Sequence, residues 1–128
     1  MKIELAPRNI EVELPNYGTF NVIPLGAGAE AEIKVVHRKI AELNEEVKKY
    51  NGIVEKEKNG EDVDKESEEY KNALKAYNDL LDAFSELKDI TLEKMRGCFK
   101  GKNAEKIFND FSYEQIMQIY SEAVNSNE

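Results

Sequence analysis

The chain has almost none of the residues that make nucleophilic or metal-binding sites, with one cysteine and one histidine among its 128 residues. A single cysteine, Cys98, excludes an intramolecular disulfide and any metal site built from several cysteines. His37 and Cys98 are far apart in the chain, and no acid–histidine–nucleophile set can be assembled around them. We therefore predict that the protein is not an enzyme and holds no cofactor or metal.

Long apolar runs are also missing. No stretch approaches the roughly 18 apolar residues that a membrane-spanning helix needs. The first residues, Met1 to Leu5, lack the cationic and apolar segments of a signal peptide. Bases are scarce: 18 Lys and Arg against 26 Asp and Glu give a net charge of −8. An acidic chain is repelled by phosphate backbones and anionic lipid, so we expect a cytoplasmic protein without nucleic-acid or membrane partners.

The first 25 residues are predicted to form a β-hairpin. Ile10, Val12 and Leu14 alternate with glutamates, which is the period of a half-buried strand. Residues 15–18, Pro-Asn-Tyr-Gly, suit a turn, and residues 19–23 supply a second strand. A shorter extended piece at residues 2–5 either pairs with a strand or stays unpaired, and the sequence leaves both open. An isolated hairpin is marginal in water, so helices or strands of another chain must cover its apolar face.

A first long helix is predicted over residues 29–51, with Gly28 as its cap. Its apolar residues recur at spacings of three and four, which is the pattern of an amphipathic helix. We call this set the first-helix stripe: Ile33, Val36, Ile40, Leu43, Val47 and Tyr50. The stripe is interpreted first as core, with an exposed seam for self-association or a partner as the alternative.

After a charged connector over residues 52–63, with a turn at Asn59-Gly60, a second long helix is predicted over residues 64–100. A break near residue 90 is the alternative to one continuous helix. The apolar face of this helix has the same spacing of three and four, and Leu80 and Leu87 widen it. Its main positions are Tyr70, Leu74, Tyr77, Leu81 and Phe84.

Two short helices are predicted over residues 103–124. Ser112 and Gln115 have the spacing of a capping box, and Phe111 and Ile116 that of a hydrophobic staple. The predicted fold is therefore α+β and mostly α, in one domain of residues 1–128. An N-terminal β-hairpin precedes two long antiparallel amphipathic helices and a short C-terminal helical pair.

The glycines before the first helix raise the alternative of a nucleotide-binding site. Residues 26–31, Gly-Ala-Gly-Ala-Glu-Ala, fit a variant of the dinucleotide fingerprint. Pro24 ends the preceding strand, a charged turn and a helix follow instead of a second strand, and Glu30 would oppose a phosphate. A hinge or helix cap is the better interpretation.

Three segments resemble one protein family. They are residues 4–10 (Glu-Leu-Ala-Pro-Arg-Asn-Ile), residues 23–30 (Ile-Pro-Leu-Gly-Ala-Gly-Ala-Glu) and residues 108–117 (Phe-Asn-Asp-Phe-Ser-Tyr-Glu-Gln-Ile-Met). Each is similar to the corresponding part of tail assembly chaperones from long-tailed, siphovirus-type phages and prophages of Gram-positive bacteria. The resemblance covers most of the chain apart from the acidic connector, and none of the segments is a catalytic signature.

The resemblance implies a helper protein in the host cytoplasm that is absent from the mature virion. Such chaperones bind the tape measure protein, keep it soluble and help to recruit tail tube subunits of the major tail protein. Amphipathic helices cover helical partners in this way. The residues predicted to bind the partner are the first-helix stripe, namely Ile33, Val36, Ile40, Leu43, Val47 and Tyr50, together with Ile116, Ile119 and Tyr120. Homo-oligomerisation is left open.

Two other functions are compatible with the sequence. The protein could be a structural tail or connector subunit that stays in the virion and pairs its hairpin with neighbouring strands. It could also be an acidic inhibitor that mimics DNA. Residues 55–69 hold eight acids against three lysines, which is −5 of the −8 net charges. A DNA mimic needs charge spread over a face, so this concentration argues against the second alternative.

Overall fold

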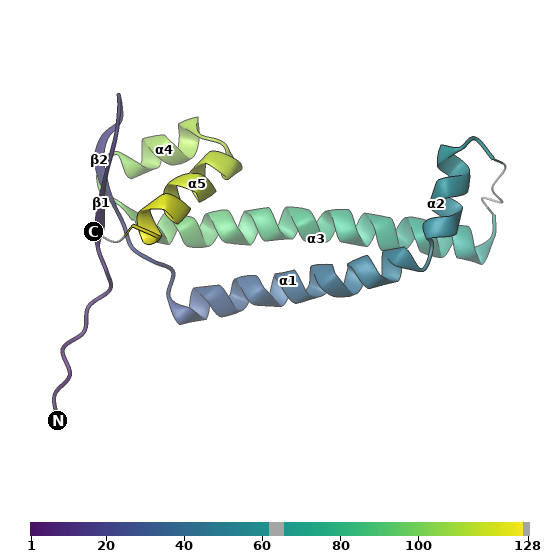
Figure 1. The fold of residues 1–128 in the computed structure, drawn as a ribbon, viewed down its shortest axis with the longest axis horizontal. Helices are drawn as coiled ribbons and strands as arrows, with labels where there is room; N and C mark the ends of the chain where they lie inside the picture. Colours follow the sequence, from purple (N-terminus) through teal and green to yellow (C-terminus); the bar gives the residue numbers. More distant parts are fainter. Residues whose placement is uncertain (62–65, 127–128) are drawn as a thin grey trace. The chain divides into compact units, whose positions relative to one another are not determined.

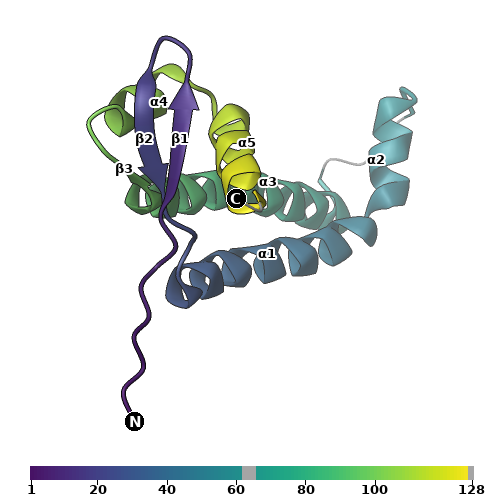
Figure 2. The ribbon, with the colours of Figure 1, turned by 60° about the vertical axis from the view of Figure 1, so that its left-hand side comes forward.

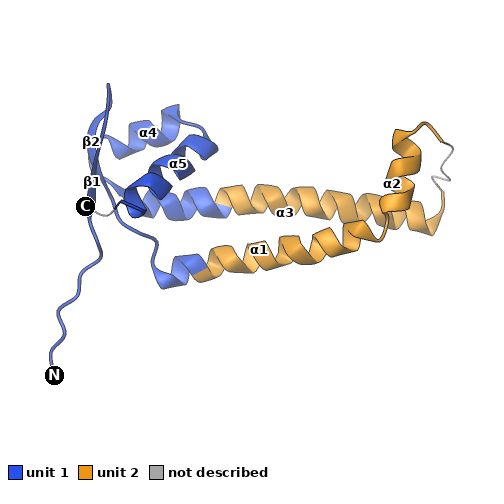
Figure 3. Cartoon of the chain, viewed as in Figure 1, with its two compact units in different colours: residues 1–30, 90–128 blue, residues 31–89 orange. Residues whose placement is uncertain are grey.

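The computed structural model describes residues 1–61 and 66–126. Its elements are β1 (Ile10–Leu14), β2 (Gly18–Val22), α1 (Ala27–Lys48), α2 (Asn51–Lys58), α3 (Glu68–Cys98), β3 (Phe99–Lys100), α4 (Ala104–Asp110) and α5 (Tyr113–Val124) (Figure 1). The mostly helical α+β fold with an N-terminal hairpin is confirmed. The chain divides into two compact units, which we call the hairpin unit (residues 1–30 and 90–128) and the helical unit (residues 31–89) (Figure 3).

The predicted hairpin is present, and its turn explains the register. The backbone N–H of Tyr17 donates to the carbonyl of Leu14 at 3.1 Å, and Asn16 has φ of 71°. Proline at the second turn position followed by a left-handed asparagine is typical of a type II turn. β1 and β2 pair antiparallel from Ile10 opposite Val22 to Leu14 opposite Gly18. This register places Val12 opposite Phe20, so both strands point apolar side chains to the same face.

A third strand was not predicted. β3 contains two residues, Phe99 and Lys100, and pairs antiparallel with β2, so that the sheet order is β1-β2-β3. The N–H of Ile23 extends this pairing by donating to the Cys98 carbonyl at 2.8 Å. Gly101 follows with φ of 115°, a conformation that residues with a Cβ rarely adopt. A two-residue strand is too short to produce an alternating pattern, which is why the sequence did not indicate it.

The core of the hairpin unit lies between the sheet and helices α3 to α5. Its most deeply buried side chains are Phe20, Val22, Met95, Ile107 and Ile116, each at most 2% exposed. The ring of Phe99 lies 5.6 Å from that of Phe20 and 5.1 Å from that of Phe108, measured between centroids. Helices α4 and α5 cover the same face of the hairpin (Figure 2).

The local signals of α5 are confirmed in detail. Ser112 Oγ accepts from the Gln115 N–H at 3.2 Å, and Gln115 Oε1 accepts from the Ser112 N–H at 2.9 Å. Together these bonds form the predicted capping box. Phe111 and Ile116 both pack into the core of the hairpin unit, as the staple pattern indicates.

The helical unit differs from the prediction at its connector. Residues 52–58 of the segment predicted as a charged connector belong to helix α2, and the turn at Asn59 and Gly60 follows it, with Gly60 at φ of 75°. Helix α3 begins at Glu68, and the alternative break near residue 90 is absent because the helix is continuous to Cys98. The predicted start of the second helix, at residues 64 and 65, lies outside the described residues. Helix α1 starts at Ala27, so that Gly28 is in its first turn rather than at its cap.

Candidate protein-binding surface

The first-helix stripe lies on the face of α1 that is used inside the chain's own fold. Val36, Ile40 and Val47 are buried, and the other three positions, Ile33, Leu43 and Tyr50, are half-buried. Helices α1 and α3 run antiparallel in the helical unit, where Lys39 and Glu86 form an ion pair (Figure 1). Leu43 and Tyr50 then share a hollow with residues 72–79 of α3. The stripe therefore serves core packing, which was its first interpretation.

The predicted positions on α5 are also part of a core. Ile116 is 2% exposed, and Ile119 and Tyr120 are half-buried against the sheet. The hydroxyl oxygen of Tyr120 accepts a hydrogen bond of 2.8 Å from the Leu25 N–H, which holds the segment between β2 and α1. Burial raises the pKa of Tyr120 above that of an exposed tyrosine. A partner cannot reach the four buried residues of the predicted site, Val36, Ile40, Val47 and Ile116, while the chain stays folded.

Helix α3 carries exposed apolar surface. Of its predicted apolar positions, Tyr70 and Leu80 are buried. Three alanines that the prediction did not include, Ala73, Ala76 and Ala83, complete this buried face, and all five residues are at most 8% exposed. The second face, which we call the outer stripe, is exposed: Leu74 (47%), Tyr77 (39%), Leu81 (60%) and Phe84 (44%).

The division follows from helix geometry. Successive residues are about 100° apart around the axis, so apolar residues at both positions 73, 76, 80, 83 and positions 74, 77, 81, 84 occupy about half of the circumference. One neighbouring helix covers only part of such an arc. Alanines suit the covered part because their small side chains leave room for the larger residues of α1. The outer stripe is left facing solvent at spacings of three, four and three residues.

A groove continues the outer stripe towards α2. Ile53 and Glu57 of α2 and residues of α3 from Tyr70 to Leu81 line a hollow of about 350 Å³. The hydroxyl of Tyr70 donates to Glu57 Oε1 at 3.3 Å, which links α3 to α2 at this groove. Leu74, Tyr77 and Leu81 belong to both the groove and the outer stripe. The groove and the outer stripe together form a continuous apolar surface, with Glu57 and Asn78 as polar residues of the groove. Sites that receive an amphipathic helix have this character.

The outer stripe lies in an electrically balanced part of an acidic chain. Residues 70–88 contain three lysines (Lys71, Lys75, Lys88) and three acids (Asp79, Asp82, Glu86), a net charge of zero. Asn78 and Ser85, which flank the stripe, are uncharged. This surface therefore repels neither an acidic nor a basic partner.

The one cysteine and the one histidine of the chain differ in exposure. Cys98 is 6% exposed, and burial raises the pKa of its thiol, which keeps the weakly nucleophilic protonated form. His37 is an exposed residue of α1. Within residues 1–61 and 66–126, no group of three histidine, cysteine or acidic side chains is placed to hold a metal ion. The helices of the same ranges include none with the length and apolar content to cross a membrane.

Comparison of the chain with protein-family models, with curated proteins and with solved structures found no match. A binding site on this chain is therefore assigned from its own geometry. Sequence periodicity located the outer stripe among the apolar positions of the second helix. It could not separate the stripe from the buried face, because both have the same spacing.

Proposed function

We propose that this protein is a tail assembly chaperone of a long-tailed phage or prophage, which binds the tape measure protein and keeps it soluble while tail tube subunits assemble. The outer stripe of α3 is the observation that carries this proposal. It presents four large apolar side chains in a row on a folded chain that has a core of its own. Exposed contiguous apolar surface of this kind is typical of interaction sites.

The chemistry of the partner fits the surface. A tape measure protein is a long chain with helical, apolar-periodic sequence, and an amphipathic helix can lay its apolar residues along Leu74, Tyr77, Leu81 and the groove beside α2. The net charge of −8 favours solubility of a complex between the two proteins. The resemblance of residues 4–10, 23–30 and 108–117 to chaperones of this class supports the same function.

Co-expression with the tape measure protein tests the proposal. We expect wild-type chain to co-purify with it and Leu81→Asp to lose it, because a buried carboxylate in an apolar interface carries a large desolvation cost. Val35→Asp is the matched control, since Val35 is also 60% exposed but lies on α1 outside the groove. If Leu81→Asp still co-purified with the tape measure protein, the outer stripe would be refuted as the binding surface. The same would follow if both variants stayed folded and both failed to co-purify.

The main alternative is a structural tail or connector protein, which the open edge of the sheet favours. A chaperone leaves the particle, whereas a structural subunit stays. Mass spectrometry of purified virions therefore separates the two functions. We expect peptides of the tape measure and tail tube proteins and none of this chain. Stoichiometric recovery of the chain from virions would favour the structural alternative.

A further inference from the structure

Strand β1 has an open edge. The sheet order is β1-β2-β3, and among the described residues only β2 pairs with β1. The outer edge of β1 thus has backbone N–H and C=O groups that are free to pair with another strand. Its inward side chains, Ile10, Val12 and Leu14, are half-buried, and Glu11 and Glu13 point to the opposite, solvent-facing side.

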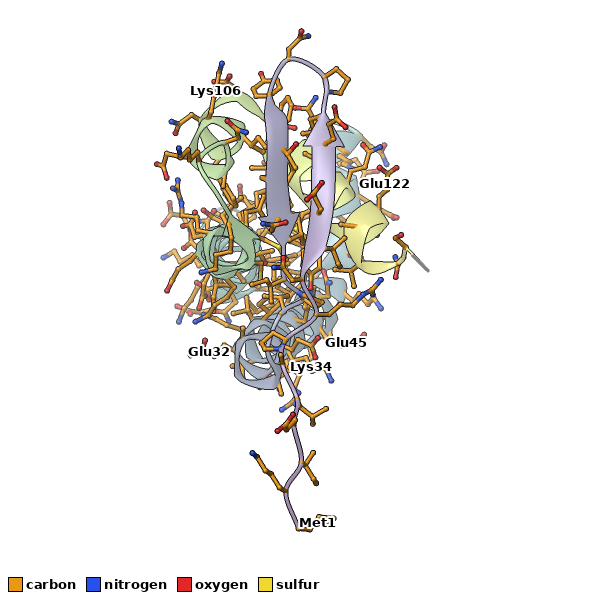
Figure 4. The ribbon with its side chains drawn as sticks, turned by 90° about the vertical axis from the view of Figure 1, so that its left-hand side faces the viewer. Met1, Glu32, Lys34, Glu45, Lys106 and Glu122 are labelled. Atoms are coloured by element: carbon orange, nitrogen blue, oxygen red, sulfur yellow. The ribbon has the colours of Figure 1, made fainter. Side chains whose placement is uncertain are left out.

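A groove runs along this edge. Residues 10–14 of β1 form one wall, and Ile119, Glu122, Ala123 and Ser126 of α5 and the segment after it form the other. The groove has a volume of about 290 Å³. Figure 4 shows Glu122 on α5 beside β1, on the side away from β2. A strand that pairs with β1 would place every second side chain in this groove.

The chain carries a segment with the matching pattern, which we call the arm (residues 1–8). Ile3 and Leu5 are 67% and 90% exposed and alternate with Lys2 and Glu4. The guanidinium of Arg8 donates to the carbonyls of Val124 and Ser126, which anchors the base of the arm beside the groove. Beyond Arg8 the arm leads away from the sheet to Met1, so it does not lie on its own β1 (Figure 4).

We propose that the arm of one copy adds to the β1 edge of a second copy, and that the two copies exchange arms about a two-fold axis. Residues 2–5 then pair antiparallel with residues 8–11 of the other copy, with Ile3 beside Ile10 in the groove. This inference goes beyond the proposed function and does not depend on it. Isologous exchange covers the first residues of β1, Ile10 and Glu11, in both copies at once and stops at a dimer.

Charge favours this register over two alternatives. It places Lys2 opposite Glu11 and Glu4 opposite Asn9, so that each dimer gains two Lys–Glu pairs and no acid faces another acid. Shifting the arm by two residues towards the turn keeps a Lys–Glu pair, Lys2 with Glu13, but places Glu4 opposite Glu11. Direct pairing of two β1 strands about their centres would place Glu11 opposite Glu13. Like charges directly opposite are destabilising, so both arrangements are disfavoured.

Sedimentation equilibrium of the full chain, from micromolar to millimolar concentration, tests the exchange. We expect a reversible dimer of the 14.6 kDa chain, and Ile3→Asp to weaken it at least about tenfold, because the groove would enclose a carboxylate. Leu81→Asp is the control and should leave the dimer intact. A chain that stays monomeric, or a dimer that survives Ile3→Asp, would overturn the proposal, as would a dimer that Leu81→Asp alone dissolves.

Charge reversal tests the register. Lys2→Glu and Glu11→Lys should each weaken the dimer by roughly 2- to 30-fold, the effect of two cross-strand pairs of about 0.2–1 kcal/mol. The double variant should recover the wild-type dissociation constant. A double variant as weak as the product of the two single variants would contradict the pairing of these residues.

Disulfide trapping gives an independent readout. In a Cys98→Ala background, a mixture of Lys2→Cys and Glu11→Cys copies should oxidise to a cross-linked pair, because directly opposed Cβ atoms on paired strands are close enough for a disulfide. A mixture of Lys2→Cys and Glu13→Cys is the matched control. Cross-linking of both mixtures at equal rates, or of neither, would exclude the proposed register.

Discussion

Lys39 on α1 and Glu86 on α3 face each other across the helical unit, with Lys39 Nζ 3.0 Å from Glu86 Oε2. This pair marks the antiparallel alignment of the two helices and the side of α3 on which α1 lies. Both side chains are about half exposed, so the ion pair itself contributes little to stability. The buried residues beside it hold the helices together, and the outer stripe is what α1 leaves uncovered.

Substitutions on the two faces of α3 should differ in their effect on the free energy of unfolding. Ala83 is 1% exposed, so Ala83→Leu should overpack the interface and lower the free energy of unfolding by about 1–3 kcal/mol. Leu81→Ala removes a larger side chain from the outer stripe, yet should change stability by less than about 0.5 kcal/mol. Urea denaturation measures both. Equal losses would mean that Leu81 is a core residue.

The capping box predicts that the hydroxyl of Ser112 contributes measurably to the stability of the protein. Ser112→Ala removes the acceptor of the Gln115 N–H and should destabilise the protein by about 1 kcal/mol. Ser85→Ala, at an exposed position inside α3, is the control and should lie within about 0.5 kcal/mol of wild type. Thermal unfolding by circular dichroism compares the two. Indistinguishable midpoints would show that the cap adds nothing to stability.

Tyr120 supplies a side-chain acceptor to the segment between β2 and α1. Tyr120→Phe removes the hydroxyl that accepts from the Leu25 N–H and leaves this part-buried donor without that bond. The expected loss of unfolding free energy is about 1 kcal/mol. Tyr77→Phe, on the outer stripe, should be neutral. Amide exchange of Leu25 provides a local readout, and should accelerate in Tyr120→Phe only.

Alkaline pH should weaken the hairpin unit. Burial raises the pKa of Cys98 above 9.0 and that of Tyr120 above 10.0, so both groups keep their protons longer in the folded chain than in the unfolded chain. The unfolded state then loses protons first, and the stability present below pH 9 falls as pH rises through the folded pKa values. Denaturation at a series of alkaline pH values checks this. Cys98→Ala should show a shallower fall from pH 9, and an unchanged slope would contradict the assignment.

Local patterns were sufficient for most of the elements. The alternation of Ile10, Val12 and Leu14 predicted β1, and Ser112 with Gln115 predicted the start of α5, because each signal acts over a few neighbouring residues. Helix α2 and strand β3 were not predicted because neither has a clear local pattern. The first lies in a sequence dense in charge, and the second is too short to show a period.

The sequence did not show which apolar residues are exposed and so available to a partner. Periodicity selects every residue that can face an apolar partner, and it selected the first-helix stripe, Ile116 and the outer stripe alike. Val36, Ile40, Val47 and Ile116 turned out to be buried, whereas Leu74, Tyr77, Leu81 and Phe84 are exposed. Whether the outer stripe receives a helix of the tape measure protein stays a proposal for the co-purification experiment to test.

The amino-acid sequence by itself determined the order of strands and helices, the caps and the acidic charge, since these depend on local conformation and composition. Only the tertiary structure decided which apolar surfaces are covered. An apolar residue gains the same free energy against any apolar neighbour, so burial depends on which helix or strand lies opposite. Helix α1 covers the alanine face of α3 and leaves the outer stripe, and α5 covers the face of β1 and leaves its edge.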